Sequence, residues 1–390
     1  MSFQMHIPTR ILFGAGKLSE LHEQLMPGKK ALVVVSNGKS TKENGYLERT
    51  LKQLELAHVE TVVFDQIEPN PLHTTVMNGS SIGRNNHCDF VVALGGGSVL
   101  DASKAISAMM TNEGTVWDYM NGGTGKAKPI NHPALPIIAI TTTAGTGSEV
   151  DQWGVISNLD TNEKIGFGGI ESLFPVIAVV DPELMVTVPA KYTAYQGFDA
   201  LFHSVECYIS KMANEMSDMY ALKAIENIAK YLPIAYQNGK DIKARSRVAF
   251  ANTLSGVVME LSCCTSEHAM EHAMSAYHHD LPHGAGLIMI SKEYYQYFVE
   301  QHACDQRFID MAKTMGKKDA DKPQDFIDAL VELQMACEVD NLKMSDYGIS
   351  LDEADNLAKN ARETMGGLFY ADPIELNHEN CKIIFEKSYR

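Results

Sequence analysis

The seven cysteines of this chain include no Cys-x-x-Cys pair. That absence argues against a structural zinc lobe, and the odd number argues against a disulfide framework. Long apolar runs are also missing, because stretches such as Phe174–Val180 are far too short to span a bilayer. The first ten residues contain no apolar core of a signal peptide. We therefore expect a cytoplasmic protein whose cysteines are small core residues.

Basic side chains are outnumbered, since 33 Lys and Arg stand against 49 Asp and Glu, giving a formal net charge of −16. Nucleic acids and anionic membranes are bound by clustered basic residues, so neither is an expected partner. Hydrophobic residues make up 45% of the 390 residues, which suffices for a packed interior. The length exceeds what one hydrophobic core usually serves, and we therefore expect two domains.

Short apolar runs typical of buried parallel strands alternate with helical patterns in the first half of the chain. Helical spacing of apolar residues occurs in Tyr46–Ala57 and Ser98–Met109. The alternation predicts an N-terminal Rossmann-like parallel α/β domain over residues 1–187. Its strand candidates are Ala31–Val35, Thr61–Phe64, Phe90–Leu94, Pro136–Thr141 and Val176–Val180.

The pattern changes to successive long helices after residue 187. From Thr193 onward no segment has strand character, so residues 188–390 are predicted to form an all-α domain. The last helix is expected to begin with Asp372 as its cap and Pro373 in its first turn. We expect the active site in the cleft between the two domains.

A glycine turn joins the strand at Phe90–Leu94 to the next helix. Glycines let the backbone approach a pyrophosphate, and a helix N-terminus favours an anion. Ser98 and Asp101 also fit a capping box. The alternative is a tight turn with a good cap and no ligand. The cofactor-binding candidates here are Gly95, Gly96, Gly97, Ser98 and Asp101.

A second polar loop, Thr141–Glu149, follows the next predicted strand. In open α/β sheets ligands bind outside the carboxyl ends of the strands, where both loops should converge. The hydroxyl groups of Thr142, Thr143 and Thr146 can donate to phosphates or to a carboxamide. The two loops together predict a crevice for a dinucleotide.

The loop Asn37-Gly38-Lys39-Ser40 bears on the choice of cofactor. It lacks the carboxylate that NAD-specific enzymes often present to the ribose hydroxyls. Backbone amides near Gly38, and the Ser40 hydroxyl, can donate to a 2′-phosphate instead. We therefore favour NADP(H), with NAD(H) as the alternative. The earlier segment Gly14–Ser19 resembles a dinucleotide fingerprint but lacks its third glycine.

The helical half concentrates histidine and acidic residues at four-residue spacing. Asp199 and His203 share one helix face, which a simple helix-internal hydrogen bond would also explain. The spacing recurs at His268 and His272, and His283 follows in Pro-His-Gly. This clustering favours a divalent ion, because three imidazoles and one carboxylate suit iron(II) or zinc. The neighbouring His278 and His279 are expected to be exposed loop residues without partners.

These motifs together resemble the iron-containing alcohol dehydrogenase family, especially its butanol dehydrogenase-like members. The resemblance covers both domains and implies hydride transfer between NAD(P) and a small primary alcohol, diol or aldehyde. It places His272 near the substrate and nicotinamide, where it can deliver a proton, and Lys164 near the nucleotide. It also implies a homodimer. The metal ligands that it implies are Asp199, His203, His268 and His283.

Three other functions fit the sequence less well. A dehydroquinate-synthase-like lyase must hold a phosphorylated substrate, but Glu260–Ile290 contains no Lys or Arg. A glycerol-dehydrogenase-like enzyme fits the fourth metal ligand and the motifs less well. A non-catalytic nucleotide-binding protein would have no need of the complete ligand set.

Overall fold

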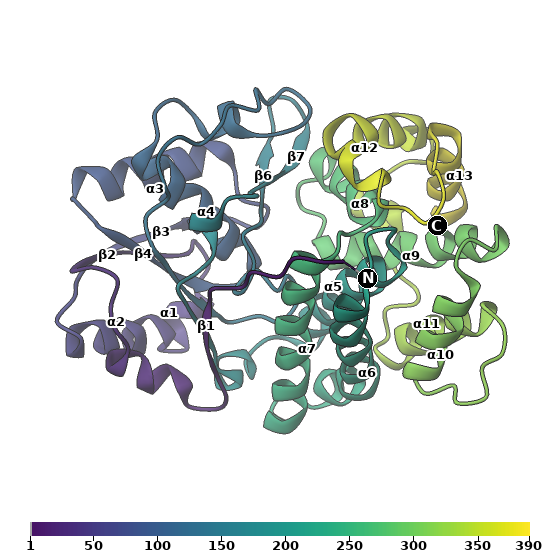
Figure 1. The fold of residues 1–390 in the computed structure, drawn as a ribbon, viewed down its shortest axis with the longest axis horizontal. Helices are drawn as coiled ribbons and strands as arrows, with labels where there is room; N and C mark the ends of the chain where they lie inside the picture. Colours follow the sequence, from purple (N-terminus) through teal and green to yellow (C-terminus); the bar gives the residue numbers. More distant parts are fainter. Residues whose placement is uncertain (1) are drawn as a thin grey trace.

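Six parallel strands form the sheet of the computed structural model, which describes residues 2–390 (Figure 1). Their order is β1-β8-β5-β4-β2-β3. All five predicted strands are confirmed, and β1 adds an edge strand whose Arg10 pairs with Ile177. The strands are β1 (Arg10–Phe13), β2 (Lys30–Ser36), β3 (Glu60–Ile67), β4 (Phe90–Gly95), β5 (Ile137–Thr141) and β8 (Ile177–Val180).

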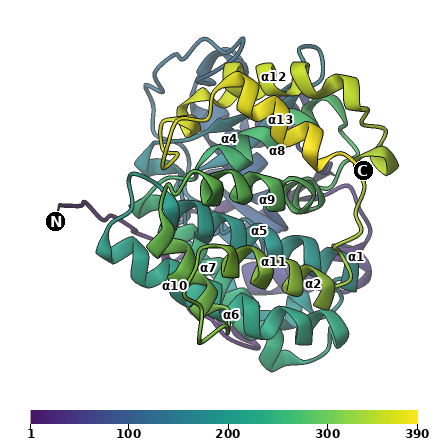
Figure 2. The same ribbon diagram turned by 90° about the vertical axis from the view of Figure 1, so that its right-hand side faces the viewer.

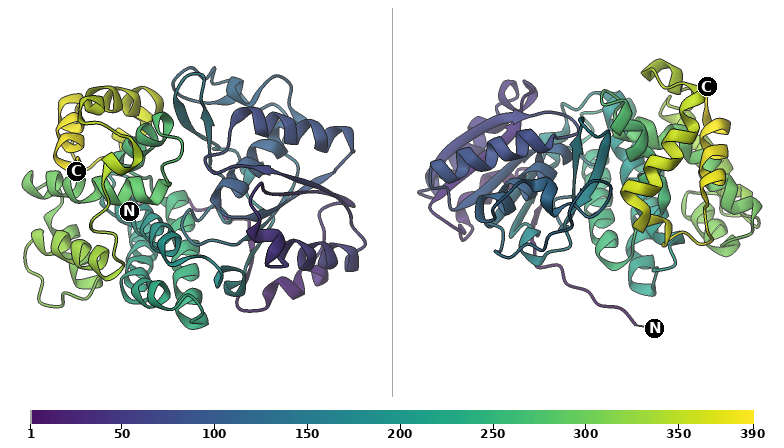
Figure 3. Two further views of the ribbon diagram at one scale, coloured as in Figure 1. Left: turned by 180° about the vertical axis from the view of Figure 1, so that it is seen from behind. Right: turned by 90° about the horizontal axis from the view of Figure 1, so that it is seen from above.

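Helices cover both faces of this sheet, which explains the continuous apolar runs (Figure 3). On β2, Leu32 and Val34 pack in the layer of α3 (His73–Asn85) and α4 (Gly97–Thr111). The alternate residues, Ala31 and Val33, face a second layer. That layer contains η1 (Lys17–Glu23) and α2 (Tyr46–Leu56), and the short α1 (Ser40–Glu43) precedes α2. The two predicted crossover helices are α2 and α4.

An antiparallel hairpin that the sequence patterns did not predict leaves the sheet after β5. It consists of β6 (Gly154–Asn158) and β7 (Glu163–Phe167), in which Ser157 pairs with Lys164. The strands are short and carry polar residues, so their strand signal is weak. The short helical turns of this half are η2 (Val116–Tyr119), η3 (Glu171–Leu173) and η4 (Pro182–Met185).

The remainder of the chain is helical, and from Thr193 to Arg390 the structure contains no strand, as predicted (Figure 2). The central helix α5 is buried, and its Phe202 stacks on Tyr295. The helices are α5 (Ala190–Ile209), α6 (Glu215–Gln237), α7 (Ile242–Leu261), α8 (Ser266–Tyr277), α9 (His283–Glu300), α10 (Asp305–Thr314), α11 (Gln324–Ala336), η5 (Met344–Tyr347), η6 (Leu351–Glu353), α12 (Ala354–Phe369) and α13 (His378–Ser388).

The predicted start of the last helix is wrong. Helix α13 begins at His378, and its cap is Asn377, whose side chain accepts from the Asn380 amide. Asp372 is instead fully buried, where it accepts hydrogen bonds from Ser266. The Asp372 carboxylate therefore links the segment after α12 to the start of α8 and does not cap the last helix.

Among residues 2–390, no single helix is long and apolar enough to cross a membrane. Helices α7 and α8 reach the length and apolar composition of a membrane span only when they are taken together, and they meet at a bend of 109°.

Candidate active site

The two glycine-bearing loops meet at the carboxyl edge of the sheet, because β4 and β5 are neighbours and Gly95 pairs with Thr141. Gly96 and Gly97 begin α4 and face the second loop. A Cβ on Gly96 would lie 2.9 Å from Cγ2 of Thr143, and one on Gly97 would collide with Thr146. The turn therefore needs glycine where the two loops touch.

The side chains of Asp101 and Lys104 on α4 anchor the second loop, Thr141–Glu149, through hydrogen bonds. The two Asp101 oxygens accept from Ser148 Oγ at 2.7 Å and from the Val155 amide at 2.9 Å. Lys104 Nζ donates to Ser148 Oγ at 2.7 Å and to Asp151 Oδ1 at 2.6 Å. Burial raises the pKa of Asp101 to about 6. The predicted capping box is wrong, because Gly96 is the cap of α4 without a side-chain bond.

A second anchor ties the same loop to the helical part of the chain. The buried carboxylate of Glu149 accepts from Asn252 Nδ2 at 2.9 Å and from Thr253 Oγ1 at 2.8 Å. Gly147 donates its amide to Asn252 Oδ1 at 2.8 Å. These contacts leave Thr142, Thr143 and Thr146 partly exposed on the loop.

The loop after β2 lies at the same edge, since β2 pairs with β4. Gly38 and Ser40 are exposed there. A carboxylate does stand nearby, but it comes from β3. Asp65 accepts a hydrogen bond from Lys42 Nζ at 2.6 Å, and that lysine lowers the Asp65 pKa.

A buried carboxylate oxygen forms the centre of the histidine cluster. Oδ1 of Asp199 lies 3.3 Å from Nδ1 of His203, 3.5 Å from Nε2 of His268 and 3.6 Å from Nε2 of His283. One ligand atom from each of Asp199, His268 and His283 lies within 4.8 Å of the others. The ring of His203 stacks on that of His268 with centroids 4.2 Å apart. The structure thus brings together all four residues predicted to bind metal.

Two glycines allow this cluster to form between elements that are distant in sequence. A Cβ on Gly284 would collide with the carbonyl of Tyr195, so the start of α9 can approach α5 and bring His283 to Asp199. A Cβ on Gly145 would lie 2.9 Å from Oδ2 of Asp199. The threonine-bearing loop therefore lies directly beside the histidine cluster.

The protonation preferences of Asp199, His203 and His283 suit a divalent cation. Burial would raise the pKa of Asp199, but the neighbouring histidines outweigh it and hold the value at about 2. Burial lowers the pKa of His203 to about 4, and burial together with Lys164 lowers that of His283 well below its usual value. An ionised carboxylate beside neutral imidazoles is the form in which these groups bind metals. Although burial would lower it, Glu206 and Asp199 raise the pKa of His268 well above its usual value, so a metal binding to that ring displaces a proton.

Two glutamates that the sequence analysis missed orient the cluster. Glu206 accepts a hydrogen bond from Nδ1 of His268, and Glu271 accepts one from Nδ1 of His283. Both carboxylates are fully buried. Carboxylates commonly fix the orientation of metal-ligating histidines in this way. The available signal was an acidic residue close in sequence to each metal-binding motif, Glu206 after His203 and Glu271 before His272.

His272 lies beside the cluster without joining Asp199. Its ring centroid is 5.3 Å from that of His283 and 6.3 Å from that of His268. The side chain is buried, and among residues 2–390 its Nδ1 has no hydrogen-bond partner. Burial, with further contributions from Lys164 and His283, holds its pKa well below the usual value, so the ring is neutral.

Lys164 reaches the cluster from β7 of the α/β part. Its Nζ donates to Ser275 Oγ at 2.8 Å and to Glu271 Oε2 at 3.3 Å, and it lies 3.5 Å from Nδ1 of His283. The lysine is buried. It therefore joins the hairpin to α8 through the carboxylate that orients His283.

The two histidines after α8 lie in a loop, as predicted, but neither is exposed, and only His279 has a buried Nδ1 without a hydrogen-bond partner among residues 2–390. Both are partly buried, and Nε2 of His278 lies 2.7 Å from Oε2 of Glu353. The backbone oxygen of His279 accepts from Asn70 at 2.9 Å. This turn contacts both the α/β part and the segment before α12.

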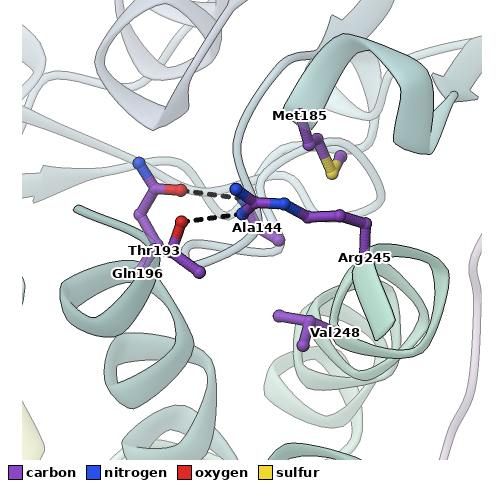
Figure 4. A pocket seen from close by; sticks show the side chains of 6 residues that line it. All are labelled: Ala144, Met185, Thr193, Gln196, Arg245 and Val248. Carbon is purple, nitrogen blue, oxygen red and sulfur yellow. Dashed lines mark hydrogen bonds between the residues drawn. The ribbon is translucent and has the colours of Figure 1, made fainter. Parts of the chain in front are cut away.

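A small cavity lies beside α5 and the loop Thr141–Glu149, to which Ala144 belongs (Figure 4). Its volume is about 10 Å³, which is room for about one water molecule. Arg245 crosses it and donates to Thr193 Oγ1 at 2.7 Å. The cavity is therefore too small for a substrate. Its lining residues are Ala144, Met185, Thr193, Gln196, Arg245 and Val248.

Comparison with known proteins gives one family for both halves of the chain. Residues 8–182 match the sequence profile of iron-containing alcohol dehydrogenases. Residues 193–389 match the profile of the C-terminal region of the same family. The 1,3-propanediol dehydrogenase of Klebsiella pneumoniae is 33% identical over 100% of both chains. NADH-dependent butanol dehydrogenase A of Clostridium acetobutylicum is 32% identical over 100% of both.

Solved structures show the same similarity. An alcohol dehydrogenase from a halo-thermophilic archaeon of a Red Sea brine pool is 34% identical, with a TM-score of 0.94 over 100% of this chain and 99% of the other. A 1,3-propanediol oxidoreductase is 32% identical, with a TM-score of 0.90 over 100% of both. This chain therefore belongs to the iron-containing alcohol dehydrogenase family.

Proposed function

We propose that this alcohol dehydrogenase binds one iron(II) ion through Asp199, His203, His268 and His283. The observation that carries the proposal is the position of Asp199 Oδ1, which lies within 3.6 Å of a ring nitrogen from each histidine. In addition, Nδ1 of the buried His203 has no hydrogen-bond partner among residues 2–390. Three imidazoles and one carboxylate suit iron(II) and leave room for an oxygen ligand, although zinc accepts the same donors.

Each participating group then has a separate chemical task. When bound, iron(II) would supply the Lewis acidity that lowers the pKa of a substrate hydroxyl, and a nicotinamide cofactor would supply the hydride acceptor for alcohol oxidation. The neutral ring of His272 can accept the hydroxyl proton in that direction. In aldehyde reduction the same ring would deliver the proton, which it must first take up because it is neutral at rest. Glu206 and Glu271 keep His268 and His283 directed toward Asp199.

The cofactor is proposed to lie along the carboxyl edge of the sheet. Gly95, Gly96, Gly97 and Ser98 would take the pyrophosphate at the start of α4, with Thr142, Thr143 and Thr146 on the facing loop. Because Gly145 of that loop abuts Asp199, a nicotinamide held there is directed to the metal site. Lys164 donates a hydrogen bond to Glu271, so it must break this bond before it can bind the nucleotide.

We further propose that NADP(H) is accepted and preferred through the loop of Gly38 and Ser40. The exposed donors of that loop favour this choice, whereas the name of the butanol dehydrogenase relative favours NADH. Steady-state kinetics with both cofactors test the proposal. A kcat/KM for NADH more than about tenfold above that for NADPH, which corresponds to about 1.4 kcal/mol, would reject the preference.

The substrate is proposed to be a small uncharged primary alcohol, diol or the matching aldehyde. The absence of Lys and Arg from Glu260–Ile290 supports this class, as do the propanediol and butanol named for the relatives. Following the absorbance of the reduced cofactor with alkanals, diols and phosphorylated alcohols tests it. Preferential turnover of the phosphorylated compounds would overturn the proposal.

Elemental analysis of protein purified without oxygen tests the ligand assignment. We expect about one iron per chain in the wild type, and loss of both iron and turnover in His268→Ala and His283→Ala. Full metal content and activity in these variants would contradict the assignment.

We also propose a domain boundary at residue 187, a homodimer and a cytoplasmic location.

A further inference from the structure

We propose that Cys264 provides a second, sulfur-containing coordination mode, in which His203, Cys264 and His268 bind a zinc-like divalent cation. One potential ligand atom from each of these three residues lies within 4.8 Å of the others. The inference rests on the proposed function, because that function assigns the two histidines to iron. It goes beyond that function because it adds Cys264, which is not one of the proposed iron ligands, as a metal ligand.

The placement of Cys264 follows from the turn between α7 and α8. It precedes the first residue of α8 by two positions and is partly buried, four residues before His268. Its Sγ lies 3.9 Å from Sγ of the buried Cys207, and all seven cysteines are free. The thiol is therefore near the histidines without being used in a disulfide.

A buried ring nitrogen of His203, a ligand in both proposed coordination modes, lies 3.3 Å from Asp199 Oδ1 without a hydrogen bond to it. His203 is only 7% exposed, and its Nδ1 has no hydrogen-bond partner among the described residues. Leaving a buried polar atom unpaired costs about 1–3 kcal/mol. A bound cation removes that cost, and the ring stacked 4.2 Å from His268 shows that both imidazoles belong to one small volume.

The two donor sets favour different metals. Asp199, His268 and His283 combine oxygen and nitrogen donors, whereas the alternative set has the Cys264 thiolate in place of the carboxylate and His203 in place of His283. Thiolate ligands favour softer ions such as zinc over iron(II). Binding at Cys264 releases the thiol proton to solvent as the metal–sulfur bond forms. Because both sets contain His268, an ion in the sulfur mode excludes iron from its proposed position.

Cobalt(II), as a spectroscopic substitute for zinc, tests the sulfur bond directly. Anaerobic addition of one equivalent to the metal-free protein should produce a thiolate-to-cobalt charge-transfer band. The band should disappear in Cys264→Ser and Cys264→Ala, and persist in Cys207→Ser and Cys304→Ser. Circular dichroism verifies that each variant is folded. A wild type without the band, or a band that follows Cys207 instead of Cys264, would overturn the proposal.

Metal affinity provides a second readout that separates this inference from the proposed function. Competition with a chromophoric chelator should show zinc affinity lowered at least about tenfold in Cys264→Ser, with iron affinity unchanged. In His283→Ala the iron affinity should fall while the cobalt–sulfur band remains. An iron-loaded, active wild type without the band rejects only the sulfur mode. A band in a protein without iron-dependent turnover rejects the proposed function alone.

Discussion

Nδ1 of His268 donates a hydrogen bond to Oε2 of Glu206, while Nε2 of the same ring faces Asp199 at 3.5 Å. Glu271 and His283 repeat this relationship, with Nε2 of His283 at 3.6 Å from Asp199. A carboxylate on Nδ1 keeps the proton on that nitrogen and leaves the Nε2 lone pair for a metal. The two glutamates thus determine which nitrogen each histidine presents.

Replacing either glutamate with an amide should weaken iron binding. Glu206→Gln and Glu271→Gln retain the side-chain size but lose the charge, and we expect iron affinity to fall about 10–100-fold. Chelator competition measures this. Glu267→Gln is the matched control, because Glu267 is equally buried on α8 but binds Tyr295 and no histidine. An equal loss of affinity in the control would assign the effect to general damage.

Removal of the His272 ring should impair turnover and spare the metal. His272→Ala is expected to lower kcat on the order of 100-fold with unchanged iron content. The His272 pKa lies well below its usual value, so the neutral base is lost only as pH falls through that low value. The variant should lack this acidic limb in its pH profile. His279→Ala, which changes a partly buried histidine of the same region, should retain it.

The buried Lys104 should be essential for the threonine-bearing loop. Lys104→Met leaves Asp151 charged without its partner, so we expect about 3–5 kcal/mol loss of unfolding free energy and a higher KM for the cofactor. Urea unfolding and steady-state kinetics measure the two effects. The exposed Lys126, paired with Asp118, is the control, and Lys126→Met should cost less than about 1 kcal/mol. Similar losses in both variants would contradict the anchoring role.

Glu260 should make stability depend on pH. Burial raises its pKa to about 7, above the ordinary 4.5, so the folded protein holds a proton that the unfolded chain has lost between these values. Its contribution to stability is complete below pH 4.5 and is lost as pH rises through 7. Glu260→Gln removes this dependence, so the variant should gain stability relative to the wild type from pH 5 to pH 8. Urea unfolding at both values checks the sign, and a constant difference would contradict it.

An acidic residue in the loop after β2 should discourage NADP(H). Asn37→Asp places a negative charge beside Gly38 and Ser40, where we expect the 2′-phosphate, so kcat/KM for NADPH should fall and that for NADH should change little. Asn86→Asp adds the same charge after α3, at the opposite edge of the sheet, and is the control. An unchanged cofactor ratio in Asn37→Asp would show that the phosphate lies elsewhere.

The sequence by itself determined the elements whose signal is local. Continuous apolar runs such as Val33–Val35 predicted the strands because both faces of a parallel sheet are buried. The sequence also showed the glycine turn at Gly96 and Gly97, because such a turn involves only adjacent residues. It showed the pairing of Asp199 with His203 as well, because residues four apart share one helix face.

Only the tertiary structure decided the partners of buried charges. Asp101 looked like a local cap but binds Ser148, and Asp372 looked like a cap but binds Ser266. The links from Glu206 to His268 and from Cys264 to the histidines likewise join different helices or turns. A buried polar group takes whichever partner satisfies it, and that partner is set by packing between distant segments, which no local periodicity encodes.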